Sequence, residues 1–168
     1  MLDVFKKRRS YRKYKDKKIE DEKIDEILRA CMTAPSAMHT RAWEFVVIRD
    51  KNMIQKLGDL KQYSLFARNS NAVIVVCSKD WKRWMEDACI VAEHIYLEAT
   101  NQGLGTCWIQ VSGSKDIQGG DAEEYLRKAL GIPEDIRVLC FFSIGYPDQE
   151  LPEHKGEIET EKVHKEIW

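Results

Sequence analysis

The sequence predicts a domain of mixed helices and strands that is organised around one buried helix at about residues 87–103. Small and apolar side chains recur there at i, i+3 and i+4 and form a stripe along one side of the helix. Ile90 and Leu97 lie on the opposite side, and a helix that is apolar on two faces is typical of a buried position. Two short apolar runs, at 72–77 and 138–144, are typical of buried central strands. We therefore expect a mixed fold with about four core strands.

The length and composition of the chain favour one soluble domain that comprises residues 1–168. No apolar run reaches the ~20 residues of a membrane helix, and the N-terminus lacks the apolar core of a signal peptide. We therefore expect a cytoplasmic protein that does not bind membranes. The five cysteines form no Cys-x-x-Cys pair, and the four histidines lack metal-ligand spacing. Neither a disulfide framework nor a metal site is expected.

The first half of the chain shows clear helix and strand signals. An amphipathic helix at 20–32 begins with an acidic turn and must end before Pro35, because proline disfavours helical geometry in the preceding residue. The other expected elements are a short helix within residues 2–8, a strand at 43–48 and a helix between its N-cap Asp50 and Gly58.

The second half ends in an acidic arm. Before it we expect a strand at 106–111, a helix that begins with a capping box of Asp121 and Glu124 and ends at Gly131, and a strand at 138–144. The arm, residues 148–168, holds seven acids and three lysines and could not pack a core alone. Its few apolar side chains either dock on another surface, such as a second subunit, or belong to a frayed tail.

The N-terminus is strongly basic, since residues 1–18 carry nine Lys/Arg and two Asp. Within it, segment 8–14 (RRSYRKY) places three arginines near one serine. Guanidinium groups and a hydroxyl can surround a phosphate. From these residues alone, a solvated basic face or a nuclear-import or nucleic-acid patch is the favoured interpretation, and a phosphate site is the alternative.

Two further segments allow a structural and a functional interpretation. The loop of small residues at 34–41 either lets the backbone approach a flat ligand or simply connects a helix to a strand. Trp81 and Trp84 would share one face of a helical turn, where they either cover the core or form an aromatic wall beside a site.

Several segments, in this order, resemble landmarks of the flavin-dependent nitroreductase family. Segment 8–14 is similar to its RRSxRxY/F entry motif, and segment 34–47 (APSAMHTRAWEFVV) to its APSxxNxQPWxFVVV motif. GLG at 103–105 and the stretch 131–147, from GIP to IGYP, match two later landmarks. The tail 163–168 (VHKEIW) resembles the closing VHxExW. The resemblance spans nearly the whole chain.

The resemblance implies an α+β fold, with a mixed, mostly antiparallel sheet of four to five strands surrounded by helices. It also implies an intertwined homodimer, in which the arm 148–168 packs on the partner and two FMN molecules lie at the interface. The resemblance implies that Arg8 and Ser10 contact the FMN phosphate with Arg9 beside them, and that Arg12 contacts the ribityl chain and the pyrimidine edge. It implies that Pro35, Ser36 and Ala37 pack on the ring from the partner subunit, with His39 nearby. It also implies that Trp108, Ile109 and Gln110 lie along the flavin and that Lys155 is a further phosphate contact.

The sequence departs from the family pattern in the second motif. The family's asparagine, glutamine and proline are His39, Arg41 and Ala42 here, so the side-chain contacts of this loop must differ, while its backbone contacts can persist. The stretch 78–87 before the central helix is short and leaves a more open site, which Trp81 or Trp84 would line.

The implied activity is that of an oxidoreductase. Hydride passes from NADH or NADPH to flavin N5 and then to a small acceptor such as a nitroaromatic or a quinone, and a cationic Arg12 near N1 and O2 stabilises the reduced flavin. The flavin carries the chemistry, so we assign no catalytic side chain. Two alternatives are a flavin-binding protein without turnover and a nucleic-acid-binding module, although no nucleic-acid motif accompanies the basic N-terminus.

Overall fold

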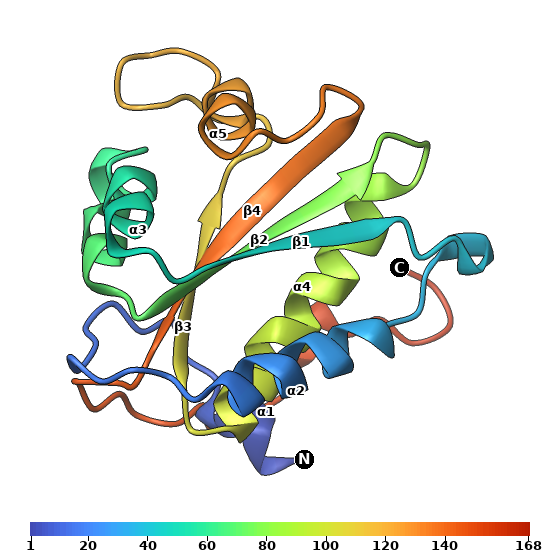
Figure 1. Cartoon of the computed structure of the whole chain (residues 1–168). Coiled ribbons are helices and arrows are strands. Elements are labelled where there is room, and N and C mark those ends of the chain that lie inside the picture. The colour runs from blue at the N-terminus through green and yellow to red at the C-terminus, as the bar shows by residue number, and fades with distance from the viewer.

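The computed structural model describes all residues, 1–168, and contains one four-stranded sheet with helices on both faces (Figure 1). Every helix falls short of the length or the apolar content that a membrane-spanning segment needs. In chain order the elements are α1 (Asp3–Lys7), α2 (Asp21–Met32), the 3₁₀ turn η1 (Ala37–His39), β1 (Trp43–Ile48), α3 (Lys51–Gly58), η2 (Gln62–Asn69), β2 (Ala72–Lys79), α4 (Trp84–Asn101), β3 (Gly105–Gln110), α5 (Ala122–Leu130), β4 (Ile136–Gly145) and η3 (Thr160–Lys162).

The strands lie in the order β1-β2-β4-β3, and each neighbouring pair is antiparallel. Val75 lies opposite Val46 on one side and opposite Phe141 on the other, and the register between β2 and β4 shifts at Val76/Cys77. A single parallel bridge joins Ser10 to the edge strand β3. The α+β class is confirmed, and the sheet has four strands.

The sheet separates two apolar cores. The larger core lies between the sheet and the helices α2 and α4, and the smaller one lies under α3, η2 and α5. Figure 1 shows these helix sets on opposite faces of the sheet. Alternate residues of β2 enter each core, as Ile74 and Val75 do, so the strand is buried on both faces. This explains why β2 and β4 appear in the sequence as continuous apolar runs.

The central helix α4 departs from expectation in its burial. It begins three residues earlier than expected, at Trp84, and its predicted stripe is fully buried against the sheet and α2. The opposite face is only partly covered, because Leu97 is half-buried and Ile90 is 39% exposed. Burial on both faces was therefore a wrong prediction for the single chain.

The residues predicted to begin or end helices α3 and α5 are confirmed. The Asp50 carboxylate accepts a hydrogen bond from the Met53 N–H at 2.8 Å, and Asp121 accepts one from the Glu124 N–H at 2.9 Å. Gly131 ends α5 with φ of 67°, a left-handed conformation that glycine adopts without strain.

Trp81, which precedes α4, and Trp84, its first residue, both cover the core, which is the structural one of their two interpretations. Trp84 is 8% exposed within the larger core, and the Arg137 guanidinium lies 4.5 Å from its ring centre. Trp81 is partly buried against the same core.

The arm 148–168 contains only the short turn η3 and is mostly exposed. Its first part returns to the N-terminus, where the His154 N–H donates to the Lys6 carbonyl at 2.9 Å. Its apolar residues beyond that point have no cover, since Ile158, Ile167 and Trp168 are 77%, 81% and 98% exposed.

Candidate functional site

The N-terminal segment lies along the open edge of β3. Ser10 forms a bridge with Thr106, and the Tyr11 N–H donates to the Thr106 carbonyl at 2.9 Å. The close approach requires Gly105, because a Cβ atom there would lie 2.8 Å from the Tyr11 Cβ. This glycine therefore makes room for the segment; the helix cap is Gly103, with φ of 73°.

Tyr14 fixes the other end of this segment. Its hydroxyl donates to the Tyr11 carbonyl at 2.7 Å and shares a hydrogen bond of 2.8 Å with the Ser143 hydroxyl. Burial raises the pKa of Tyr14 well above its usual range, so the phenol stays neutral. The segment between Ser10 and Tyr14 is thus held against the sheet at both ends.

The four basic-motif residues predicted to bind a phosphate come together. An open cavity of about 550 Å³ is lined by Arg8, Arg9, Ser10, Arg12, Gln149, Leu151 and His154. None of the three arginines forms an ion pair with a carboxylate, which leaves three positive charges beside one hydroxyl.

The arm completes this cavity through a residue next to the predicted one. The Arg8 guanidinium lies 3.3 Å from the His154 Nε2, and Arg9 donates to the Pro152 carbonyl. Lys155 does not line the cavity and is exposed. The structure therefore places His154, and not Lys155, at the arginine cluster of its own chain.

The edge of β3 beside Ser10 offers free backbone groups. The Val111 N–H donates to the Leu139 carbonyl, so odd-numbered residues pair with β4 and even-numbered ones face away. Of these, the Trp108 N–H donates to the Tyr96 hydroxyl at 2.9 Å. The Gln110 N–H has no strand partner on this edge, which leaves a donor for a bound group.

The side chains of β3 divide between the two faces. Trp108 packs edge-to-face on Phe142, with ring centres 5.4 Å apart, and its Nε1 donates to the Gln110 Oε1 at 2.9 Å. Ile109 is fully buried in the smaller core. Because its side chain is enclosed there, only its backbone lies near the edge, and the contact of Ile109 with a flavin stays a prediction for its main chain.

The second predicted group lies elsewhere in the chain. Pro35, Ser36, Ala37 and His39 belong to the loop that contacts the start of α4, where the Ala37 N–H donates to the Asp87 carboxylate at 2.8 Å. Tyr96, beside the arginine cluster, comes nine residues later, which is about 13 Å along a helix. Figure 1 shows η1 and α1 near opposite ends of α4. One chain does not bring the two groups together.

Sequence reasoning missed two buried polar residues at the site. Tyr96 contacts both Ser10 and Trp108, and it continues the row of Ala88 and Ala92 at i+4 spacing. A hydroxyl in an otherwise apolar row is a signal that could have indicated it. Lys61, 4% exposed, donates to the Gln110 carbonyl and to the Ser114 hydroxyl, and no sequence pattern marked it.

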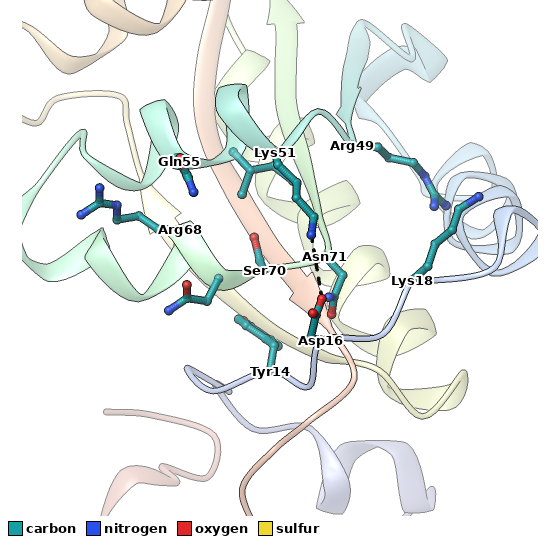
Figure 2. A pocket seen from close by; sticks show the side chains of 11 residues that line it. Tyr14, Asp16, Lys18, Arg49, Lys51, Gln55, Arg68, Ser70 and Asn71 are labelled. Carbon is teal, nitrogen blue, oxygen red and sulfur yellow. Dashed lines mark ion pairs between the residues drawn. The ribbon is translucent and has the colours of Figure 1, made fainter.

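A larger cavity of about 650 Å³ lies between the N-terminal segment, α3 and the end of η2 (Figure 2). Most of its side chains are polar, and several of its cations are paired: Lys51 lies 4.0 Å from Asp16, and Arg68 lies 3.4 Å from Asp59. These carboxylates partly neutralise its cations, whereas the three arginines of the smaller cavity form no ion pair. The larger cavity is therefore the poorer candidate for a phosphate group.

Comparisons with known proteins place the chain in one family by sequence and by fold. Residues 5–69 and 61–146 match the sequence model of the Nitroreductase family. An FMN-dependent nitroreductase of Clostridium difficile has a solved structure that superimposes with a TM-score of 0.95, at 38% identity and with 100% of both chains covered. A protein of Archaeoglobus fulgidus named "Putative NADH dehydrogenase/NAD(P)H nitroreductase" is 34% identical over 99% of this chain and 98% of its own. An iodotyrosine deiodinase of Nematostella vectensis is 32% identical over 88% of this chain and 67% of its own.

Proposed function

The chain belongs to the nitroreductase family, whose members are oxidoreductases, and on this premise we propose that it is an FMN-dependent enzyme that reduces a small acceptor, such as a nitroaromatic or a quinone, with NADH or NADPH as donor. One observation carries the proposal: three unpaired arginines and Ser10 lie together beside the open edge of β3.

The donor set of this cluster suits a phosphate monoester. Guanidinium groups present paired N–H donors that match phosphate oxygens, and the Ser10 hydroxyl adds another donor. Arg8 and Ser10 would bind the phosphate directly, with Arg9 beside them. Because none of these arginines forms an ion pair with a carboxylate, all three remain available to attract an incoming dianion.

The flavin ring would extend from this cluster along β3. Bound FMN supplies the hydride relay between the nicotinamide and the acceptor. The Gln110 N–H would donate to the ring edge. Arg12, whose guanidinium lies 5.7 Å from the Phe66 ring centre, would bring its positive charge to the pyrimidine side, where it favours the anionic reduced form.

A second copy of the chain would complete the site. The loop with Pro35, Ser36, Ala37 and His39 contacts Asp87. Asp87 lies about 13 Å along α4 from Tyr96, which is beside the arginine cluster. The partly covered apolar face of α4 and the exposed tail residues Ile167 and Trp168 supply surface that a homodimer would bury. We therefore propose a homodimer in which residues 1–168 form one domain and the arm 148–168 packs on the partner.

The test is a visible absorption spectrum of the purified protein, followed by anaerobic addition of NADH and then NADPH. We expect a flavin spectrum that bleaches. A stable flavin spectrum would instead indicate binding without turnover, and a protein that stays colourless with added FMN would contradict the proposal. Arg8→Ala should deplete the bound flavin. Arg29→Ala is the matched control, because Arg29 lies on α2 and pairs with Glu26.

A further inference from the structure

The loop that precedes β1 is held in a strained shape. Met38, His39 and Arg41 have φ values of 55°, 55° and 48°, the left-handed region that residues other than glycine rarely adopt. Three such residues within four positions persist only where the surrounding contacts fix them. Met38, at the tip, is 91% exposed, so packing on its own chain does not hold the loop there.

Hydrogen bonds on both sides of the loop tip fix the shape of the loop. The buried Asp87 carboxylate accepts a hydrogen bond from the Ala37 N–H at 2.8 Å and one from the Thr40 hydroxyl at 3.3 Å. Within the loop, the Ser36 hydroxyl accepts a hydrogen bond from the Arg41 N–H at 2.9 Å. Both sides of the loop tip are therefore anchored. The Arg41 guanidinium donates to the Met32 carbonyl of α2 at 2.7 Å, and Asp87 of α4 is the anchor that holds the main chain at Ala37.

Asp87 is an unusual residue for this position. It is 1% exposed in the first turns of α4, and no lysine, arginine or histidine forms an ion pair with it. A buried carboxylate without a cationic partner is costly and must be stabilised by hydrogen bonds and by the positive end of its helix. If this position only had to fill the core, burying an apolar residue there would cost less free energy than burying a carboxylate.

We propose that Asp87 is a positioning residue that holds the loop 36–41 in its strained shape, so that the backbone of residues 36–38 meets the flavin bound by the partner subunit. This inference rests on the proposed function. It explains how the loop keeps its backbone contacts although His39, Arg41 and Ala42 replace the side chains usual in the family. The recognition is then made by a fixed main chain, and Asp87 acts through it without touching the cofactor.

The experiment compares Asp87→Ala, Asp87→Asn and Thr40→Val with the wild type, by titration of each apoprotein with FMN and by the visible circular dichroism of the bound flavin. Asp87→Ala removes both hydrogen bonds that Asp87 accepts from the loop. It should weaken FMN binding about tenfold or more and alter the dichroism. Thr40→Val removes one hydrogen bond and should weaken binding about fivefold. Asp87→Asn should restore near-normal binding, because an amide can accept from Ala37 and donate to the Thr40 hydroxyl.

Glu123→Gln is the matched control for general destabilisation. Glu123 is also a buried carboxylate, but it lies on α5, where it binds Arg137 at 2.8 Å, away from the loop. This variant should lower the unfolding midpoint without changing FMN affinity. Equal losses of FMN affinity in Glu123→Gln and Asp87→Ala would overturn the inference.

A second readout does not need the cofactor. Trypsin should cleave the apoprotein after Arg41 faster in Asp87→Ala than in the wild type, and Glu123→Gln should leave that rate unchanged. A wild type that takes up no FMN would overturn the proposed function itself. A wild type that binds FMN, together with an Asp87→Ala variant that binds it equally tightly, would overturn only the inference about Asp87.

Discussion

The Tyr96 hydroxyl accepts a hydrogen bond from the Trp108 N–H at 2.9 Å and so joins the central helix α4 to the open edge of β3. The same hydroxyl is close to Ser10, and the Arg8 guanidinium lies 5.1 Å from the centre of its ring. Burial raises the pKa of Tyr96, which keeps the phenol protonated and able both to donate and to accept. One side chain thus contacts three parts of the proposed cofactor site.

Tyr96→Phe should loosen this site while it preserves the core. The ring would still pack edge-to-face on Phe142, 4.8 Å away, but the Trp108 N–H would lose its acceptor and Ser10 would lose the hydroxyl beside it. We expect FMN to bind about five- to tenfold more weakly, the effect of one to two hydrogen bonds. FMN titration measures it, and Tyr125→Phe in the other core is the control. Equal affinity in both variants would contradict the role given to Tyr96.

His154→Ala should weaken FMN binding, and Lys155→Ala should not. His154 lines the arginine cavity and lies 3.3 Å from Arg8, whereas Lys155 is exposed outside it. We expect an increase of about fivefold in the dissociation constant for the first variant, since one hydrogen-bonding group is lost. Titration at fixed ionic strength measures both. If Lys155→Ala weakened binding and His154→Ala did not, Lys155 would be the phosphate contact instead.

Ile90→Glu should disrupt the proposed dimer. Ile90 is 39% exposed on the partly covered face of α4, and a carboxylate buried there without a partner is unfavourable. Sedimentation velocity should show a monomer that has also lost its flavin, because the loop at Ser36 would no longer reach the partner's arginine cluster. Ile117→Glu is the control, since Ile117 is 54% exposed on a loop away from α4. Dimers in both variants would contradict this interface.

Stability should fall as the pH rises above about 8.5. Burial raises the pKa of Cys31 and of Cys77 to about 12, while a thiol in the unfolded chain has a pKa of about 8.5. Above that pH the unfolded chain releases thiol protons that the folded chain keeps, so the free energy of unfolding decreases.

The urea midpoint measured between pH 7.5 and 9.5 checks this expectation. The wild-type midpoint should decrease across that range, and Cys31→Ala, which removes one of these thiols, should show a shallower decrease. A midpoint that is constant or rises with pH would contradict the account.

The positions of the elements followed from the sequence because their signals are local. The continuous apolar run of β2 predicted burial on both faces, and Asp50 and Gly131 marked helix ends through groups within a few residues of them. The basic motif likewise placed Arg8 and Ser10 at one site, since they are neighbours in the chain.

The tertiary structure alone decided what covers each surface and which distant residues meet. The sequence showed that α4 is apolar on two sides, but periodicity does not say what packs there, and Ile90 is only partly covered in the chain. Tyr96 reaches Ser10, and His154 rather than Lys155 reaches Arg8, because chain segments far apart in sequence pack against each other. Such contacts depend on the path of the whole backbone, so no local pattern of side chains encodes them.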